Sequence, residues 1–175
     1  MANPDLPNGF EPFGPIDGGT GPIVASLGYL NASQTVAVGD ALIYSSGRLS
    51  IAVATSGSIA GVVAPQLGAT GLGENVYTTS SADDPLYFYP AGDYVFVGQC
   101  SGTYAATTVT PVDIVGTTGI MEINEGASTE DVVVILEAIT GNWRGRTGLV
   151  VGANSVVKFK FVKCMLAGET LDQTA

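Results

Sequence analysis

Residues 36–53 read VAVGDALIYSSGRLSIAV, and this stretch decides the fold class. Short apolar runs are separated by turn residues, Gly39-Asp40 first and Ser45-Ser46-Gly47 second, a pattern typical of strands joined in hairpins. In the last run the residues alternate between two faces, as in a half-buried strand: Leu49, Ile51 and Val53 on one face, and Arg48, Ser50 and Ala52 on the other. The sequence therefore predicts a meander of β-hairpins here.

Similar runs recur on both sides of this meander. Residues 131–140 read DVVVILEAIT, where consecutive β-branched residues favour a buried strand over a helix. In the run over 156–162, apolar and basic residues alternate, the first set inward and the second outward: Val157, Phe159 and Phe161, and Lys158 and Lys160. The other predicted strands are 23–30, 35–38, 41–44, 48–53, 58–64, 86–89, 94–100, 104–110, 113–124 and 149–151. We therefore expect an all-β fold, a small β-barrel or β-sandwich of short antiparallel strands.

An unusual segment precedes these strands, with residues 8–21 reading NGFEPFGPIDGGTG. Because its prolines remove backbone donors and its glycines permit turns, we expect an extended N-terminal arm (residues 1–22) with neither helix nor regular strand. An arm that stays in water gains nothing from apolar groups, yet this one carries Phe10, Phe13 and Ile16. These side chains need a surface, either the chain's own domain or a neighbouring subunit, and we expect the neighbour.

The chain thus divides into the arm (1–22), a β-barrel or β-sandwich domain (23–166) and a polar C-terminal tail (167–175). If the arm docks on a neighbour, deleting residues 1–22 should leave the β domain folded while it abolishes attachment to the partner.

Composition limits the partners. The 175 residues include 16 acidic and 6 basic side chains, a net charge of −10 at pH 7, so nucleic acid is not an expected partner. Only 13% of residues are charged, which suits contact with other proteins, although an ordinary monomer with a Thr-rich β surface has the same composition. No run is long enough to span a membrane and the N-terminus does not resemble a signal peptide, so we expect no membrane contact and synthesis for cytoplasmic use. Cys100 and Cys164 are then expected to be reduced, buried thiols.

The sequence offers little for catalysis. There is no histidine, which excludes Ser-His-Asp and Cys-His sites, and no nucleophile elbow or P-loop occurs. Asp83-Asp84 with Glu74 could hold calcium, but the EF-hand spacing is missing and a solvated loop is the better interpretation. We therefore expect no enzyme, no metal, no cofactor and no small-molecule substrate.

Basic residues gather late in the chain, since five of the six follow residue 143: Arg144, Arg146, Lys158, Lys160 and Lys163. They form either a scattered, solvated set or a docking patch for an acidic partner. Trp143, the only tryptophan, lies beside them and either anchors a turn or acts as an interface hot spot.

Four stretches resemble, in order, the structural cement or head-decoration proteins of tailed bacteriophages: NGFEPFGPIDGG, VAVGDALIYSSGRLSIAVATSGSIAGVVA, YPAGDYVFVGQC and EAITGNWRGRTGLVVGANSVVKFKFV. The resemblance implies a non-enzymatic β-rich protein that binds the outer surface of the capsid, as a homotrimer, and bridges subunits of the major capsid protein. It places the chain on the virion, assembled in the host cytoplasm. The candidate interface residues are Phe10, Phe13, Ile16, Trp143, Arg144, Arg146, Lys158 and Lys160.

Two other functions stay open. A glycan-binding module on a virion or cell surface could use Tyr87, Tyr89 and Tyr94 as stacking platforms, although strand positions explain these residues as well. A tail-tube or tail-terminator subunit would form rings or tubes by itself.

Overall fold

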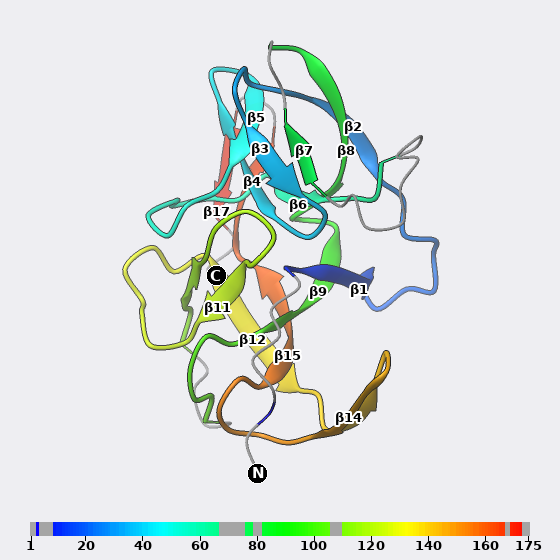
Figure 1. Ribbon diagram of the computed structural model, residues 1–175, viewed down its shortest axis with the longest axis vertical. Coiled ribbons are helices and arrows are strands. Elements are labelled where there is room, and N and C mark those ends of the chain that lie inside the picture. The colour runs from blue at the N-terminus through cyan, green and yellow to red at the C-terminus, as the bar shows by residue number, and fades with distance from the viewer. Residues whose placement is uncertain are drawn as a thin grey trace.

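The structure, a computed structural model, describes residues 3, 9–66, 76–78, 82–105, 110–166 and 169–172. Over these residues the chain is all-β, as expected, and Figure 1 shows a barrel above a second, sheet-based lobe. None of the described residues belongs to a helix that could cross a bilayer. The strands are β1 (Glu11–Pro15), β2 (Ser26–Leu30), β3 (Thr35–Ala37), β4 (Ala41–Ser45), β5 (Arg48–Ile51), β6 (Gly61–Val63), β7 (Val76–Thr78), β8 (Asp84–Pro90), β9 (Tyr94–Gln99), β10 (Asp113–Val115), β11 (Glu122–Asn124), β12 (Val133–Ala138), β13 (Gly141–Trp143), β14 (Arg146–Leu149), β15 (Val156–Phe161), β16 (Lys163–Leu166) and β17 (Glu169–Asp172).

The upper lobe is a closed barrel with the strand order β2-β5-β4-β6-β8. Its neighbouring strands are antiparallel except β2 and β5, which close the barrel through one parallel pair, Leu30 and Leu49. The barrel core is apolar: Leu30, Val36, Leu42, Leu49, Ala60, Val63, Leu86 and Phe88. The expected barrel is therefore confirmed, and its β4–β5 hairpin comes from the stretch over 36–53.

The lower lobe is built on an antiparallel sheet with the order β1-β9-β15-β12. Its inner face carries aromatic rings in mutual contact: Phe10, Phe96, Phe159 and Phe161. The β10–β11 hairpin adds Ile114, Met121 and Ile123 to this core. The alternation predicted for β15 is confirmed, because its inward side chains are buried and its two lysines are only partly so.

Residues 11–15 of the N-terminal arm form β1, which pairs with β9 at the edge of the lower sheet. This corrects the expectation of an arm without regular strand. Pro12 and Pro15 do remove backbone donors, but an edge strand has one side on which no donor is needed, so prolines are tolerated there. Residues 17–24, which follow, are exposed. Within the arm, β1 is therefore part of the sheet, and residues 17–22 face solvent.

The side chain of Phe10 finds its apolar surface within its own chain. It is 1% exposed and packs edge-on against Phe159 and Phe161, with ring centroids 5.0 Å and 6.0 Å away. Gly98 makes this packing feasible, because a Cβ at that position would lie 2.6 Å from Cδ1 of Phe10. For this residue the structure overturns the expectation of a neighbour's surface.

Asn3 anchors the start of the arm to the same lobe. Its side-chain amide donates to the carbonyls of Val150 and Ala153, and its side-chain oxygen accepts from the Val150 amide. Deleting residues 1–22 would remove these bonds, one sheet strand and a core phenylalanine. These contacts argue against the expectation that the β domain stays folded without the arm.

The turn at Gly39 and Asp40 joins the arm and both lobes. The Gly39 carbonyl, on a residue with φ of 93°, accepts from the Phe10 amide at 2.8 Å. The Asp40 carboxylate is fully buried and accepts from the amides of Ala37 in β3 and Gly119 in the β10–β11 loop, each at 2.7 Å. One turn thus holds the barrel, β1 and the β10–β11 loop together.

The observed strands differ from the predicted ones in several places. β5 ends at Ile51, and beyond it the alternation reverses, since Ala52 is buried and Val53 exposed. β7, β13 and β16 were not predicted. Residues 169–172, in the predicted polar tail, form β17, which pairs with β16 and so corrects that prediction. The strand predicted over 104–110 lies partly outside the described residues, and its described part contains no strand.

Truncating Phe10 tests whether the arm belongs to the core. We expect Phe10→Ala to lower the free energy of unfolding by about 3–5 kcal/mol, because it removes a fully buried ring. Phe13→Ala is the matched control, since Phe13 lies three residues further on and is 41% exposed, and its loss should be clearly smaller. Urea denaturation followed by circular dichroism measures both. Equal, small losses would contradict this account of β1.

Asp40 makes stability depend on pH. Burial raises the pKa of Asp40 from 3.8 to about 6, although the amides of Ala37 and Gly119 act against this. The pKa of Asp40 in the folded protein lies above its value in the unfolded chain. The contribution of Asp40 to the free energy of unfolding is therefore fully present below pH 3.8 and is lost as the pH rises through 6. Relative to Asp40→Asn, the wild-type free energy of unfolding should fall between these limits by on the order of 3 kcal/mol. Chemical denaturation at several pH values gives the free energy of unfolding of both proteins. If the two free energies change with pH in parallel, this prediction is contradicted.

Candidate functional site

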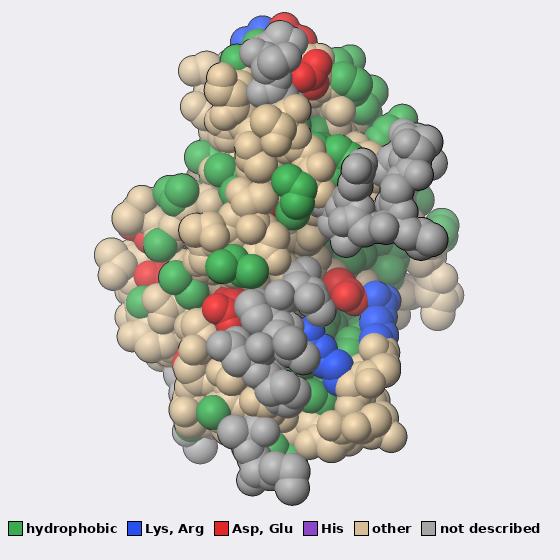
Figure 2. Space-filling view, in the orientation of Figure 1, with side chains coloured by type: hydrophobic (Ala, Val, Ile, Leu, Met, Phe, Trp, Pro, Cys, Tyr) green, Lys and Arg blue, Asp and Glu red, His purple; other side chains and the backbone are tan. Residues whose placement is uncertain are grey.

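The outer face of the lower sheet carries a group of aromatic and basic side chains that we call the aromatic–basic surface: Phe13, Trp143, Arg144, Arg146 and Lys158. They come from β1, from the β13–β14 hairpin and from β15. Figure 2 shows basic side chains, in blue, gathered on the lower part of the face in view. The fold thus brings together residues far apart in the sequence.

Rings and cations alternate on this surface. The ring centroids of Phe13 and Trp143 lie 5.5 Å apart. The Arg144 guanidinium carbon is 5.5 Å from the Trp143 ring centroid, and the Lys158 ammonium is 4.0 Å from that of Phe13. Each such cation–π contact contributes about 0.5–1 kcal/mol at an exposed site. The cations therefore hold both rings in place at the surface.

Acidic side chains border the surface as well. Glu11 forms an ion pair with Arg144, and Glu137 forms one with Lys158. Exposed pairs of this kind contribute about 0–1 kcal/mol each, so they orient side chains more than they stabilise the fold. The region is less positive than the sequence alone suggests. The fifth late cation, Lys163, donates to the backbone carbonyl of Glu130 instead.

The β13–β14 hairpin turns through only two residues, Arg144 and Gly145, with φ of 43° and 84°. Positive φ at both positions is the signature of a type I′ turn, which favours Asn and Gly. A non-glycine residue held in this region costs on the order of 1 kcal/mol. Arg144 therefore stands where backbone conformation alone would favour a different residue.

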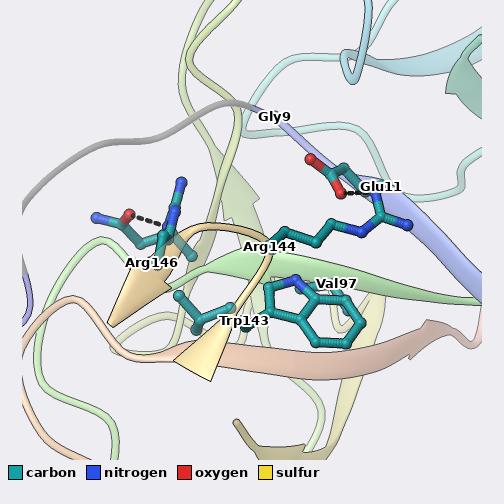
Figure 3. A pocket seen from close by; sticks show the side chains of 9 residues that line it. Gly9, Glu11, Val97, Trp143, Arg144 and Arg146 are labelled. Atoms are coloured by element: carbon teal, nitrogen blue, oxygen red, sulfur yellow. Dashed lines mark hydrogen bonds and ion pairs between the residues drawn. The ribbon is translucent and has the colours of Figure 1, made fainter. Parts of the chain in front are cut away.

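The hairpin lies over the sheet and leaves a hollow of about 80 Å³ beneath it (Figure 3). A small apolar cluster of Val97, Leu149 and Val156 packs with Trp143 under the hairpin. The close-up shows Arg144 crossing above the indole toward Glu11, with Arg146 on the other side of the hollow. Trp143 thus anchors the hairpin, as the first interpretation expects, and also lines a surface hollow. The hollow is lined by Gly9, Glu11, Val97, Gly98, Gln99, Trp143, Arg144, Arg146 and Val156.

The remaining predicted interface residues lie elsewhere. Phe10 is in the core, and the structure removes it from the candidate contacts. Ile16 is half-buried just after β1, where its amide donates to the Asp93 carbonyl. Lys160 points outward from β15 without a hydrogen bond or ion pair to any described residue. Sequence reasoning missed Glu11 and Glu137, because only strand register places them beside their cations.

The tyrosines proposed for glycan stacking do not form one platform. Tyr94 is buried, and its hydroxyl both donates to the Val24 carbonyl and accepts from the Val24 amide. Tyr89 packs edge-on against it, with ring centroids 6.1 Å apart. Only Tyr87 of the three, partly exposed on β8, is not part of this contact. Tyr94 therefore fastens the chain at Val24 to β9, and Tyr89 packs against it.

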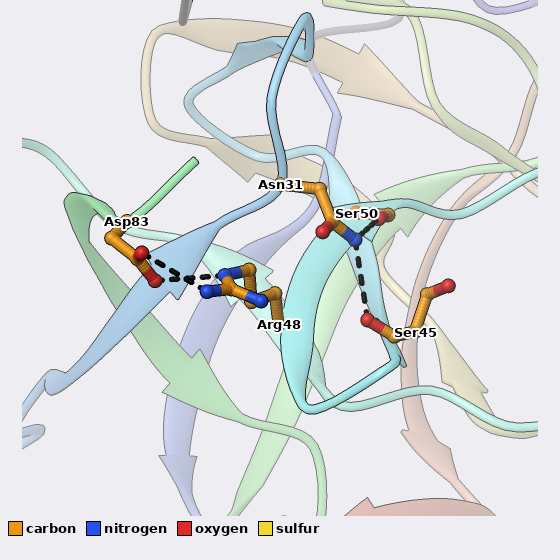
Figure 4. A network of polar contacts seen from close by, with 5 residues as sticks. All are labelled: Asn31, Ser45, Arg48, Ser50 and Asp83. Carbon is orange, nitrogen blue, oxygen red and sulfur yellow. Dashed lines mark hydrogen bonds and ion pairs between the residues drawn. The ribbon is translucent and has the colours of Figure 1, made fainter. Parts of the chain in front are cut away.

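Asp83, one of the residues considered for calcium, is engaged in a different network (Figure 4). Asp83 accepts two hydrogen bonds from Arg48, at 2.7 Å and 3.0 Å. This hydrogen bond from Arg48 lowers the pKa of the Asp83 carboxyl. Asn31 nearby donates to the Ser45 carbonyl and the Ser50 hydroxyl. Glu74 lies outside the described residues, and within the described ranges no group of three potential ligands could hold a metal.

Both cysteines are buried and unpaired, as predicted. Burial, with the nearby acids Glu125 and Glu122, raises the pKa of Cys100 to about 12. Burial, with Asp93, raises that of Cys164 to about 11. A thiol reacts as its thiolate, so neither side chain is suited to nucleophilic chemistry near neutral pH.

Comparison with known proteins found no matching family model, no matching curated protein and no matching solved structure.

Thiol labelling tests this burial. We expect Cys100 and Cys164 to stay unmodified by an aromatic disulfide reagent at pH 8 in the native protein and to react fully in denaturant. The burial that hides both sulfur atoms also keeps them protonated. Absorbance of the released thiolate measures the reaction, and fast native labelling of either residue would contradict the packing around it.

Proposed function

We propose that this chain is a structural virion protein that decorates and stabilises the outer surface of a phage capsid by bridging subunits of the major capsid protein. The observation that carries the proposal is the aromatic–basic surface, where partly exposed rings stand between cations on the face of a rigid sheet. Trp and Arg are the residue types that dominate binding energy at protein interfaces. The resemblance of four sequence stretches to cement proteins points to the same role.

The geometry changes how attachment would work. Phe10 belongs to the core, so the contact is made by preformed side chains such as Phe13 and Trp143 instead of a loose arm. Preformed contacts lose little conformational entropy on binding. In a homotrimer the same surface is presented repeatedly, and effective concentration strengthens the total. Such clamping would hold neighbouring capsid subunits together against the pressure of packed DNA.

The charge distribution suits this role. The chain carries a net charge of −10, while three of its six basic side chains lie on the aromatic–basic surface. Electrostatic complementarity sets orientation and association rate more than final affinity. A capsid exterior with acidic groups would therefore be approached with this face first.

Sedimentation with capsids tests the proposal. Purified chain should pellet with capsids of the phage that encodes it, and the Phe13→Ala, Arg144→Asn double variant should lose at least about tenfold in affinity, equal to 1.4 kcal/mol. Tyr29→Ala is the matched control, because Tyr29 is 50% exposed on the barrel, and it should bind like wild type. Thermal unfolding checks that the variants fold. A wild-type chain that stays in the supernatant would refute the proposal.

A further inference from the structure

We propose that the hollow between Arg144 and Arg146 is a docking site for a carboxylate side chain on an extended, acidic segment of a partner protein. The naming of that partner as the major capsid protein rests on the proposed function, whereas the binding chemistry rests on the site alone. The site lies on the outer face of the lower sheet, under the β13–β14 hairpin.

The two arginines are placed for carboxylate recognition. Arg144 is the first residue of the two-residue turn, Arg146 follows the turn, and the two line the same hollow from different sides (Figure 3). A guanidinium presents its N–H donors in a planar fork that matches the two oxygens of a carboxylate. Trp143 supports Arg144 from below, and Gln99 accepts from Arg146 at 3.2 Å. Both side chains are thus oriented before a ligand arrives, which lowers the entropic cost of binding.

One carboxylate of the chain itself already binds an arginine of the hollow. Glu11, which also lines the hollow, is held by Arg144 through an ion pair. This carboxylate belongs to an exposed pair, so the fold gains little from it. A partner's carboxylate can share or replace it. Glu11 is therefore an internal competitor that keeps Arg144 in position while the site is empty.

Local charge favours an acidic protein segment over a polyanion such as nucleic acid. Among the described residues, the three basic side chains of this surface are bordered by two acidic ones, Glu11 and Glu137, which leaves a single net positive charge. The chain as a whole carries −10, which repels long runs of phosphate. A segment with one or two carboxylates matches the surface, and the rings of Phe13 and Trp143 offer contact to its apolar side chains.

The backbone at Arg144 supports a binding role. A type I′ turn favours Asn at this position, yet the chain carries an arginine with φ of 43°. Conformational strain is retained where the side chain is needed for something else. Replacing Arg144 by Asn relieves that strain while it removes the ion pair and the cation–π contact, effects of similar size. Arg144→Asn should therefore stay folded and lose only the guanidinium.

The sole tryptophan provides the readout, because Trp143 lines the hollow. At low salt, titrating the full chain with an oligoglutamate of two residues, capped at both ends so that only its two side-chain carboxylates are charged, should change the tryptophan emission saturably. Oligoglutamine of the same length should not. Arg144→Asn with Arg146→Gln should weaken oligoglutamate binding by at least about tenfold, or 1.4 kcal/mol. Arg48→Gln is the matched control, since Arg48 is also an exposed, ion-paired arginine but lies on the barrel, and it should bind like wild type.

Glu11→Gln tests the internal competitor and should tighten oligoglutamate binding several-fold. Equal responses to the two peptides, or equal losses in the arginine double variant and Arg48→Gln, would overturn the inference. Capsid sedimentation separates it from the proposed function. If capsids bind the wild-type chain but oligoglutamate does not, this inference fails and the proposed function stands; the reverse result leaves the carboxylate site and removes the capsid role.

Discussion

The buried carboxylate of Asp40 is the interaction on which the arrangement of the molecule depends. Its two amide partners belong to β3 of the barrel lobe and to the β10–β11 loop of the lower lobe, and the adjacent Gly39 carbonyl receives the arm. Few apolar contacts could specify this geometry, because apolar contacts have no direction. The turn therefore joins the two lobes by directional hydrogen bonds, next to an apolar core in which barrel residues such as Ala41 and Val62 pack with the phenylalanines.

The two faces of the lower sheet separate core residues from the residues of the aromatic–basic surface. Phe10, directly before β1, faces inward, and Phe13, within β1, faces outward, so two residues only three positions apart have opposite roles. The first closes the core, and the second stands exposed beside Trp143. A rigid core directly beneath the aromatic–basic surface means that its rings and cations keep their spacing. Binding of the kind proposed here would depend on that spacing more than on adaptation.

The sequence was informative where structure is local. Alternation identified β15, and turn residues identified the β4–β5 hairpin. It failed at β1, because proline rules do not reveal that a strand lies at an edge. It also could not tell whether Phe10 covers its own domain or another, since composition is the same in both cases. The pairing of Glu137 with Lys158 depends on the register between β12 and β15, which no local pattern encodes.

Pro12 and Pro15 in β1 have a further consequence for a protein that would be crowded on a lattice. An edge strand with missing amides is a poor template for another strand, so this margin of the sheet resists edge-to-edge growth between copies. Many molecules could then stand side by side at high density without joining into fibres. The prolines that obscured the strand in the sequence would thus protect the protein from aggregation.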